Sequence, residues 1–239
     1  MCSSGARELD YRYMRQVRQI MGMPITLDVP AATGDEVFNE VFARLRQIDA
    51  RFSTHKPDSE VSRFARGEIG EDSLSPELKE VIAACRQAEQ ATDGYFSAWA
   101  IGVFEPSGYV KGWAIAQAGQ VIKEQGHKTY CLSAGGDILA SSDSDKVWNI
   151  GIQDPQDSKQ ILNTLSIPSG AVATSGNYER GEHIINPKTK KPATELLSVT
   201  VTGPDIIWAD VLATALFAMG KDKATKFIKS QKTYRAIIV

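Results

Sequence analysis

The chain lacks the features that would place it on nucleic acid or within a membrane. Its 239 residues include 27 lysines and arginines against 29 aspartates and glutamates, giving a formal net charge of −2. The basic residues form no dense stripe. Phosphate backbones are bound through excess positive charge, so we expect no nucleic-acid binding. No apolar run approaches the roughly 20 residues that cross a bilayer, so we expect no transmembrane segment.

Cysteine is scarce, and its spacing fits no metal site. Of the three cysteines, Cys85 falls in a helical pattern and Cys131 in a strand-like run. Both positions suit a small buried apolar residue. Cys2 leaves two interpretations open, an ordinary cytosolic start or the lipidated cysteine of a trimmed lipoprotein. The sequence shows no charged n-region or apolar h-region. We therefore expect a cytoplasmic protein, with a membrane-anchored lipoprotein through Cys2 as the alternative.

The pattern of apolar residues and turn residues predicts an α+β fold. Helices come first, strands follow and helices return, which is the order that this fold class accommodates. The predicted helices are 35–52, a short helix after the polar turn 53–60, then 75–94, 107–125, 206–219 and one further helix. The predicted strands are 17–29, interrupted at Gly22 and Pro24, then 129–133, 138–141, 148–153, 161–167, 197–202 and 234–239. We expect residues 173–178 to form a small polar loop. Residues 1–16 are predicted to be an extension and residues 17–239 a single domain.

The helix predicted over 206–219 carries a carboxylate and a hydroxyl on one face. Asp210 and Thr214 are four residues apart, so their side chains share that face. Such oxygen ligands form a suitable partial shell for Mg²⁺. The alternative is that Asp210 caps the helix and Thr214 packs, which is the better explanation of this pair taken alone. We expect Asp210 to be exposed and to contribute little to the core.

Three other groups allow both a chemical and a structural interpretation. Gly135-Gly136-Asp137 could bring backbone N–H groups to a phosphate, but taken alone it is typical of a hairpin turn. Lys111 could pair with phosphate beside an open Gly108 carbonyl, or face solvent at a helix entry. His183, before Ile-Ile-Asn-Pro, could be a general base or a hydrogen-bonded structural histidine.

The order of these motifs is more specific than any one of them. In chain order they are Gly22, Ser53–Glu60, Gly-Tyr-Val-Lys-Gly-Trp-Ala, Ala-Gly-Gly-Asp-Ile, Ala-Thr-Ser-Gly-Asn-Tyr, His-Ile-Ile-Asn-Pro, Ser-Val-Thr-Val and Ala-Asp-Val-Leu-Ala-Thr-Ala-Leu-Phe-Ala-Met-Gly. This succession resembles the ApbE-type FAD:protein FMN transferases, and the resemblance runs from about Gln19 to about Gly220.

The resemblance implies a fold, a reaction and a set of residues. The fold would be a single α+β domain with an antiparallel-rich sheet and an FAD cleft between sub-lobes. Family members bind FAD and Mg²⁺, join FMN to a threonine or serine hydroxyl of an acceptor protein, and release AMP. The implied residues are Gly108 (through its carbonyl), Asp210 and Thr214 at the metal, Met21, His55, Glu105, Lys111 and Val199 at FAD, and His183 as the base for the acceptor hydroxyl.

The chain departs from the usual family pattern at several of these positions. The departures are Glu105 and Asn186 for aspartate, Gly108 and Val110 for a small residue such as alanine, His55 for tyrosine, Met23 for threonine and Lys190 for a glycine. A carbonyl ligand at Gly108 does not depend on the side chain. Two other functions remain open from the sequence, an FAD pyrophosphatase that yields FMN and AMP, and a non-catalytic FAD-binding protein.

Overall fold

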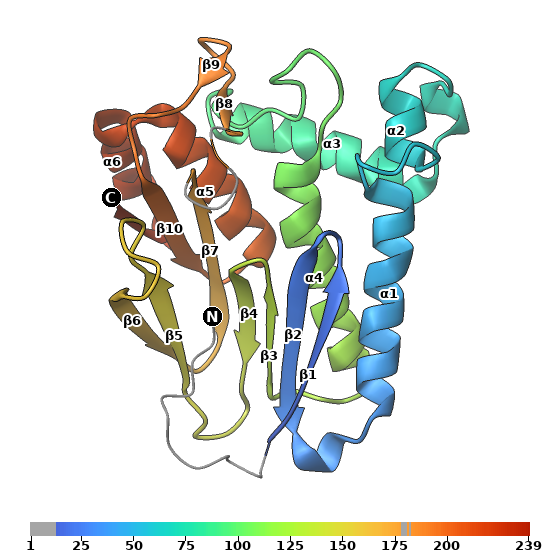
Figure 1. The fold of residues 1–239 in the computed structure, drawn as a ribbon, viewed down its shortest axis with the longest axis vertical. Coiled ribbons are helices and arrows are strands. Elements are labelled where there is room, and N and C mark those ends of the chain that lie inside the picture. Colours follow the sequence, from blue (N-terminus) through green and yellow to red (C-terminus); the bar gives the residue numbers. More distant parts are fainter. Residues whose placement is uncertain (1–12, 178–180, 182) are drawn as a thin grey trace.

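A single antiparallel sheet forms the framework of the molecule (Figure 1). The computed structural model describes residues 13–177, 181 and 183–239. Seven strands lie in the order β1-β2-β3-β4-β7-β10-β11, each antiparallel to its neighbours. They are β1 (Tyr13–Ile20), β2 (Met23–Pro30), β3 (Tyr130–Ala134), β4 (Asp137–Ser141), β7 (Gly170–Gly176), β10 (Ser198–Gly203) and β11 (Arg235–Ile238).

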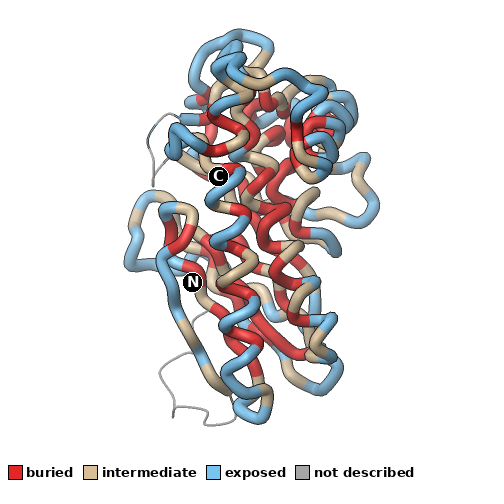
Figure 2. The backbone as a smooth tube through the Cα atoms, turned by 90° about the vertical axis from the view of Figure 1, so that its right-hand side faces the viewer, coloured by how far each residue is buried: buried red, intermediate tan, exposed pale blue. Residues whose placement is uncertain are grey.

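Four helices cover one face of this sheet. They are α1 (Glu36–Phe52), α4 (Ser107–Glu124), α5 (Ile206–Met219) and α6 (Lys221–Ser230). α5 packs on β7 and β10 and is itself flanked by α4 and α6, so it is apolar and buried almost all round. Figure 2 shows the buried segments running through the middle of the molecule.

The opposite face is partly covered by a separate hairpin, β5 (Trp148–Gln153) and β6 (Ile161–Ile167). Trp148 packs there with Ile138 and Val172 in a small second core. Their neighbours along the strands face the helices instead, for example Ala171 and Ala173 on either side of Val172. The side-chain alternation of strands thus supplies both cores from the same sheet.

Short elements gather at one end of the sheet (Figure 1). They are α2 (Glu60–Ala65), the 3₁₀ turn Glu71–Ser73, α3 (Pro76–Ala91), β8 (Ile185–Asn186) and β9 (Lys191–Pro192). A second 3₁₀ turn, Ala31–Thr33, joins β2 to α1. α3 begins as the sequence predicts: Ser75 Oγ accepts a hydrogen bond from the Leu78 N–H at 3.2 Å, and Pro76 stands at the first helical position.

The predicted fold class is confirmed, with three local corrections. The predicted strand 17–29 is two strands joined by a tight turn, in which Met21 and Gly22 have φ of 56° and 72°. Residues 173–176 are not a loop but the end of the central strand β7. β1 begins at Tyr13, within the range 1–16 that the sequence assigned to an extension.

Two other expectations concern membranes and lipidation. Within the described ranges, no helix is both long and apolar enough to span a bilayer. Cys2, on which the lipoprotein alternative depends, lies outside the described residues. Tyr178, the last residue of the predicted loop 173–178, also lies outside them.

Candidate functional site

A cavity of about 580 Å³ opens at the end of the sheet where the short elements gather. Its walls come from the β1–β2 turn, the end of α1, residues 95–105, the first turns of α4, the end of β7, residues 183–187 and the middle of α5. All the predicted site residues except Val199 line it: Met21, His55, Glu105, Gly108, Lys111, His183, Asp210 and Thr214. Residues far apart in the sequence therefore meet at one place.

Two hairpin turns form one edge of the cavity. Met21 and Gly22 make the β1–β2 turn, and Gly135 and Gly136, with φ of 54° and 89°, make the β3–β4 turn. The hairpin interpretation of Gly135-Gly136 is confirmed. A Cβ atom on Gly135 would lie 2.8 Å from Met23 Sδ, so a larger residue at this positive-φ position would have to displace the Met23 side chain.

The floor is formed where α4 and α5 come into close contact. The Gly112 N–H donates to Asp210 Oδ2 at 2.9 Å. A Cβ atom on Gly112 would lie 3.0 Å from the Ile206 carbonyl oxygen and 3.1 Å from Asp210 Cβ. Gly108 lies one turn earlier, and a Cβ there would be 3.9 Å from Thr214 Oγ1. The glycines of α4 thus allow its backbone to reach the oxygen-bearing face of α5.

The structure corrects two expectations about Asp210. It does not cap α5, because Asp205 does: its carboxylate accepts from the Trp208 N–H at 2.9 Å. Asp210 is also not exposed, since only 1% of its surface is accessible. Its carboxylate belongs to a buried polar cluster at the cavity floor.

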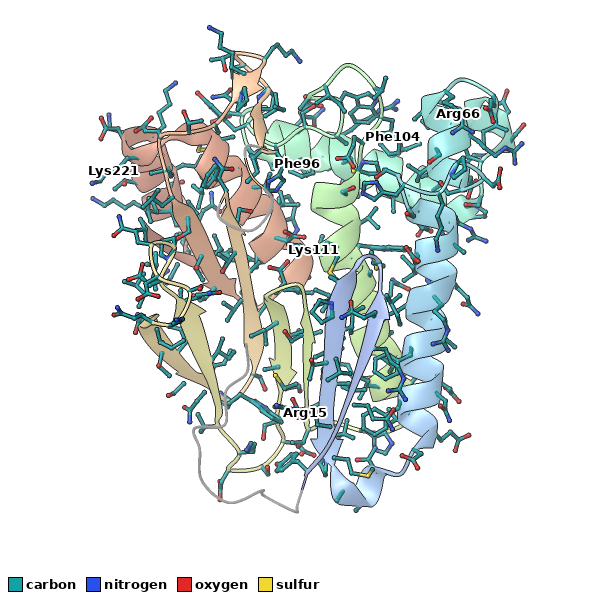
Figure 3. All side chains as sticks on the ribbon, viewed as in Figure 1. Arg15, Arg66, Phe96, Phe104, Lys111 and Lys221 are labelled. Carbon is teal, nitrogen blue, oxygen red and sulfur yellow. The ribbon has the colours of Figure 1, made fainter. Side chains whose placement is uncertain are left out.

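Lys111 lies between two buried carboxylates rather than facing solvent. Figure 3 labels Lys111 in the middle of the molecule, beside α4. Its Nζ is 2.7 Å from Asp137 Oδ2 and 3.3 Å from Asp210 Oδ1. Asp137 also accepts the Thr174 N–H at 3.1 Å, through its other oxygen. The cluster joins α4, α5, β4 and β7, and its formal charge is −1 when all three groups are ionised.

Burial and charge act against each other on these pKa values. Burial raises the pKa of Asp210 to about 7, although Lys111 pulls it down. Burial likewise raises the pKa of Asp137, against the pull of Lys111. For Lys111, burial lowers the pKa, but the attraction of Asp137 and Asp210 outweighs it and the pKa is raised overall. Lys111 is therefore a permanent cation, and it keeps the two carboxyls from a larger upward shift.

Hydroxyl groups extend the polar floor toward β7. Thr214 Oγ1 lies 3.2 Å from Ser175 Oγ. Thr174, the preceding residue of β7, is hydrogen-bonded through its Oγ1 to Thr200 Oγ1 at 2.9 Å. Among the residues that the structure describes, no group of three or more His, Cys, Asp or Glu could hold a metal. A cation here would need carboxylate, hydroxyl and carbonyl oxygens together, and Asp210, Thr214 and Gly108 offer that hard-donor set.

His183 lies at the exposed mouth of the cavity. Its Nδ1 is 2.9 Å from the Gly181 carbonyl oxygen. A carbonyl only accepts hydrogen bonds, so Nδ1 carries the proton in the neutral ring and Nε2 keeps a lone pair. This tautomer is the one that a base at the cavity mouth requires.

The remaining predicted residues differ in how they reach the cavity. Glu105 precedes α4 and accepts a hydrogen bond from Ser107. His55 is exposed on the loop after α1. Val199 is fully buried in β10, between β7 and β11, and the structure does not bring it to the cavity. The sequence marked Asp137 only as part of the Gly135-Gly136-Asp137 turn, and its pairing with Lys111 was not predicted.

Comparison with known protein families identifies the class of protein to which this fold and this cavity belong. An ApbE family model matches residues 21–105 and 103–238, and the chain belongs to the ApbE family. The family resemblance found in the sequence is thereby confirmed.

Named relatives and solved structures agree with this assignment. The chain is 25% identical over 261 residues to an FAD:protein FMN transferase of Haemophilus influenzae, covering 81% of this chain and 75% of the relative. It is 34% identical over 125 residues to one of Vibrio cholerae, covering 47% and 37%. The ApbE protein of Thermotoga maritima superposes with a TM-score of 0.84 at 23% identity, covering 95% of this chain and 94% of that one. The flavin transferase ApbE of Vibrio cholerae gives 0.80 at 20% identity, covering 95% and 96%.

Proposed function

We propose that this chain transfers FMN from FAD to a threonine or serine hydroxyl of an acceptor protein and releases AMP. The observation that carries the proposal is a single cavity with a buried lysine–carboxylate floor and a histidine at its mouth. The relatives named FAD:protein FMN transferase support it, as does membership of their family.

The proposed reaction is a phosphoryl-type displacement. The acceptor oxygen forms a bond to the phosphorus of the FMN half, and the bond from that phosphorus to the bridging oxygen breaks. AMP leaves with the bridging oxygen. The hydroxyl proton passes to Nε2 of His183, whose Nδ1–H is held by the Gly181 carbonyl.

The floor of the cavity would hold Mg²⁺ through Asp210, Thr214 and the Gly108 carbonyl. Bound there, the ion would neutralise the oxygens of the pyrophosphate. Lys111 holds Asp210 in place and favours its ionised form, and the Gly112 N–H fixes the second carboxylate oxygen. Lys111 is thus a positioning residue in this proposal as well as a nearby positive charge.

The cavity mouth would receive both substrates. Met21 and His55 lie on two loops that line the cavity, where they could contact an isoalloxazine ring. His183 is exposed at the same mouth, so an acceptor hydroxyl can reach its Nε2 without entering the core. An acceptor the size of a protein can reach the base only if the base lies at the mouth of the cavity.

Product analysis tests the proposal. The full chain is incubated with FAD, MgCl₂ and a peptide with one threonine, and AMP, free FMN and the peptide mass are followed. We expect AMP in equal amount to peptide that has gained FMN less one water, with both products lost in chelator. AMP with free FMN and unmodified peptide would indicate a pyrophosphatase. FAD binding without AMP would indicate a non-catalytic flavin-binding protein.

A further inference from the structure

Three lysines converge on one side of the cavity mouth. Lys223 Nζ donates to Tyr95 Oη at 2.7 Å and lies 5.3 Å from the centre of its ring. Lys188 Nζ lies 5.7 Å from the same ring centre. Lys190 Nζ donates to the Ala100 carbonyl at 3.3 Å. Tyr95 and Ala100 both line the cavity, so we name Lys188, Lys190 and Lys223 the lysine rim.

The lysine rim is exposed and forms no ion pair within the described part of the chain, although the Tyr95 hydroxyl and, at longer range, Glu195 raise the pKa of Lys223. All three residues are exposed, and no carboxylate among the described residues lies within 4.0 Å of their Nζ atoms. Lys56 also lines the cavity, but its Nζ is 2.5 Å from Asp49 Oδ2. The positive charge is therefore local to one side of the mouth, in a chain whose net charge is −2.

The lysine rim is carried by well-anchored backbone. Asn186 Oδ1 accepts from the Lys188 N–H at 2.9 Å, while Asn186 Nδ2 donates to the Ala218 carbonyl at 2.8 Å. The amide thus fixes the β8–β9 hairpin to the end of α5, and Lys223 stands on α6 directly after it. Figure 1 shows β8 and β9 at the same end of the molecule as α6. Lysines on anchored backbone lose less freedom when a partner binds.

We propose that the lysine rim docks an acidic segment of the acceptor protein beside the target hydroxyl. This inference rests on the proposed function, because His183 lies at the same mouth. Charge complementarity at a rim speeds association and selects among partners. Exposed Ile101, next to Ala100, offers an apolar contact for the same segment. The lysine rim thereby favours acceptors with aspartate or glutamate near the modified residue.

The test compares three peptides and two variants of the full chain. The peptides carry one threonine each, flanked by acidic, by neutral amide or by basic residues. One variant combines Lys188→Glu, Lys190→Glu and Lys223→Glu. Its control combines Lys128→Glu, Lys159→Glu and Lys226→Glu, which are exposed lysines that make the same change of charge and, unlike the lysine rim, do not contact Tyr95 or Ala100. Peptide binding is measured by fluorescence anisotropy with FAD present, and transfer by intact mass.

We expect the native chain to bind and modify the acidic peptide about tenfold better than the neutral one at low salt, and less so at high salt. The lysine-rim variant should lose that preference and the control should keep it, with FAD affinity changed less than twofold in both. Equal use of all three peptides overturns the inference. The inference is also overturned if the lysine-rim variant loses as much affinity for FAD as it loses for the acidic peptide. Binding of the acidic peptide without any transfer supports the docking and instead contradicts the proposed function.

Discussion

Replacing Lys111 by methionine tests the buried charges at the cavity floor. The Nζ atom lies 2.7 Å from Asp137 and 3.3 Å from Asp210, whose side chains are 0% and 2% exposed. Methionine keeps an apolar stem of similar length but leaves both carboxyls without their cation. Removing one partner of a buried ion pair costs about 3–5 kcal/mol. For a chain of this size we expect Tm to fall by about 6–20 °C.

The cost of this substitution should depend on pH. Without Lys111, the pKa values of Asp137 and Asp210 rise further in the folded state, while the unfolded values stay near 3.8. The folded variant then binds protons that the unfolded chain does not. Its stability is greatest at low pH and is lost as the pH rises through the raised pKa values. The deficit relative to the native chain is therefore larger near pH 8 than near about pH 5.5.

Urea unfolding in metal-free buffer at the two pH values measures the effect. Lys123→Met, which removes an exposed lysine from the same helix, is the matched control and should change stability by less than about 0.5 kcal/mol. A loss below about 1 kcal/mol for Lys111→Met, or the same loss at both pH values, would refute the reasoning.

Three further predictions concern single residues of the site. Because burial raises the pKa of Asp210 to about 7, Mg²⁺ affinity should weaken about tenfold per pH unit below that value and level off above it; calorimetry that finds no pH dependence contradicts this. Met21→Gly should relieve the φ of 56°, stabilise the fold by about 1 kcal/mol and weaken FAD binding, and an unchanged urea midpoint would count against it. Asn186→Asp loses the donor to the Ala218 carbonyl and should cost about 1–3 kcal/mol, whereas a native Tm would show that the bond has no net value.

The sequence predicted correctly those elements whose ends are set by residues close together in the chain. Ser75-Pro76 predicted the start of α3, and the apolar spacing after Asp35 predicted α1. Gly135-Gly136 predicted a hairpin turn. Each of these signals acts through contacts within a few residues of the chain, such as the Ser75 cap.

The sequence predicted the wrong local structure at two places where packing between distant elements sets the backbone conformation. Ala173–Gly176 resembles a polar loop, yet it is central strand, because small residues let α5 pack closely on β7. Gly22 marked an interruption in the predicted strand, but Met21 takes a turn conformation usual for glycine or asparagine, so the sequence did not identify the interruption as a hairpin turn.

The burial of Asp210 also results from packing between elements that are far apart in the sequence. Its partners Lys111 and Asp137 come from α4 and β4, which the fold alone brings together. The pair Asp210 and Thr214 was visible as a helical face, but the lysine–carboxylate cluster around it was not. The proposed donor pair could therefore be named from the sequence, whereas the charged groups around Asp210 could not.

The time course of acceptor mass with the native chain and with His183→Gln tests the central claim most directly. With saturating FAD and MgCl₂, the native chain should add FMN less one water to a threonine peptide and release an equal amount of AMP. His183→Gln should bind FAD equally well but transfer at least about a hundredfold more slowly, because the Nε2 base is lost. Equal rates for the two proteins, or no mass gain with the native chain, would contradict the account.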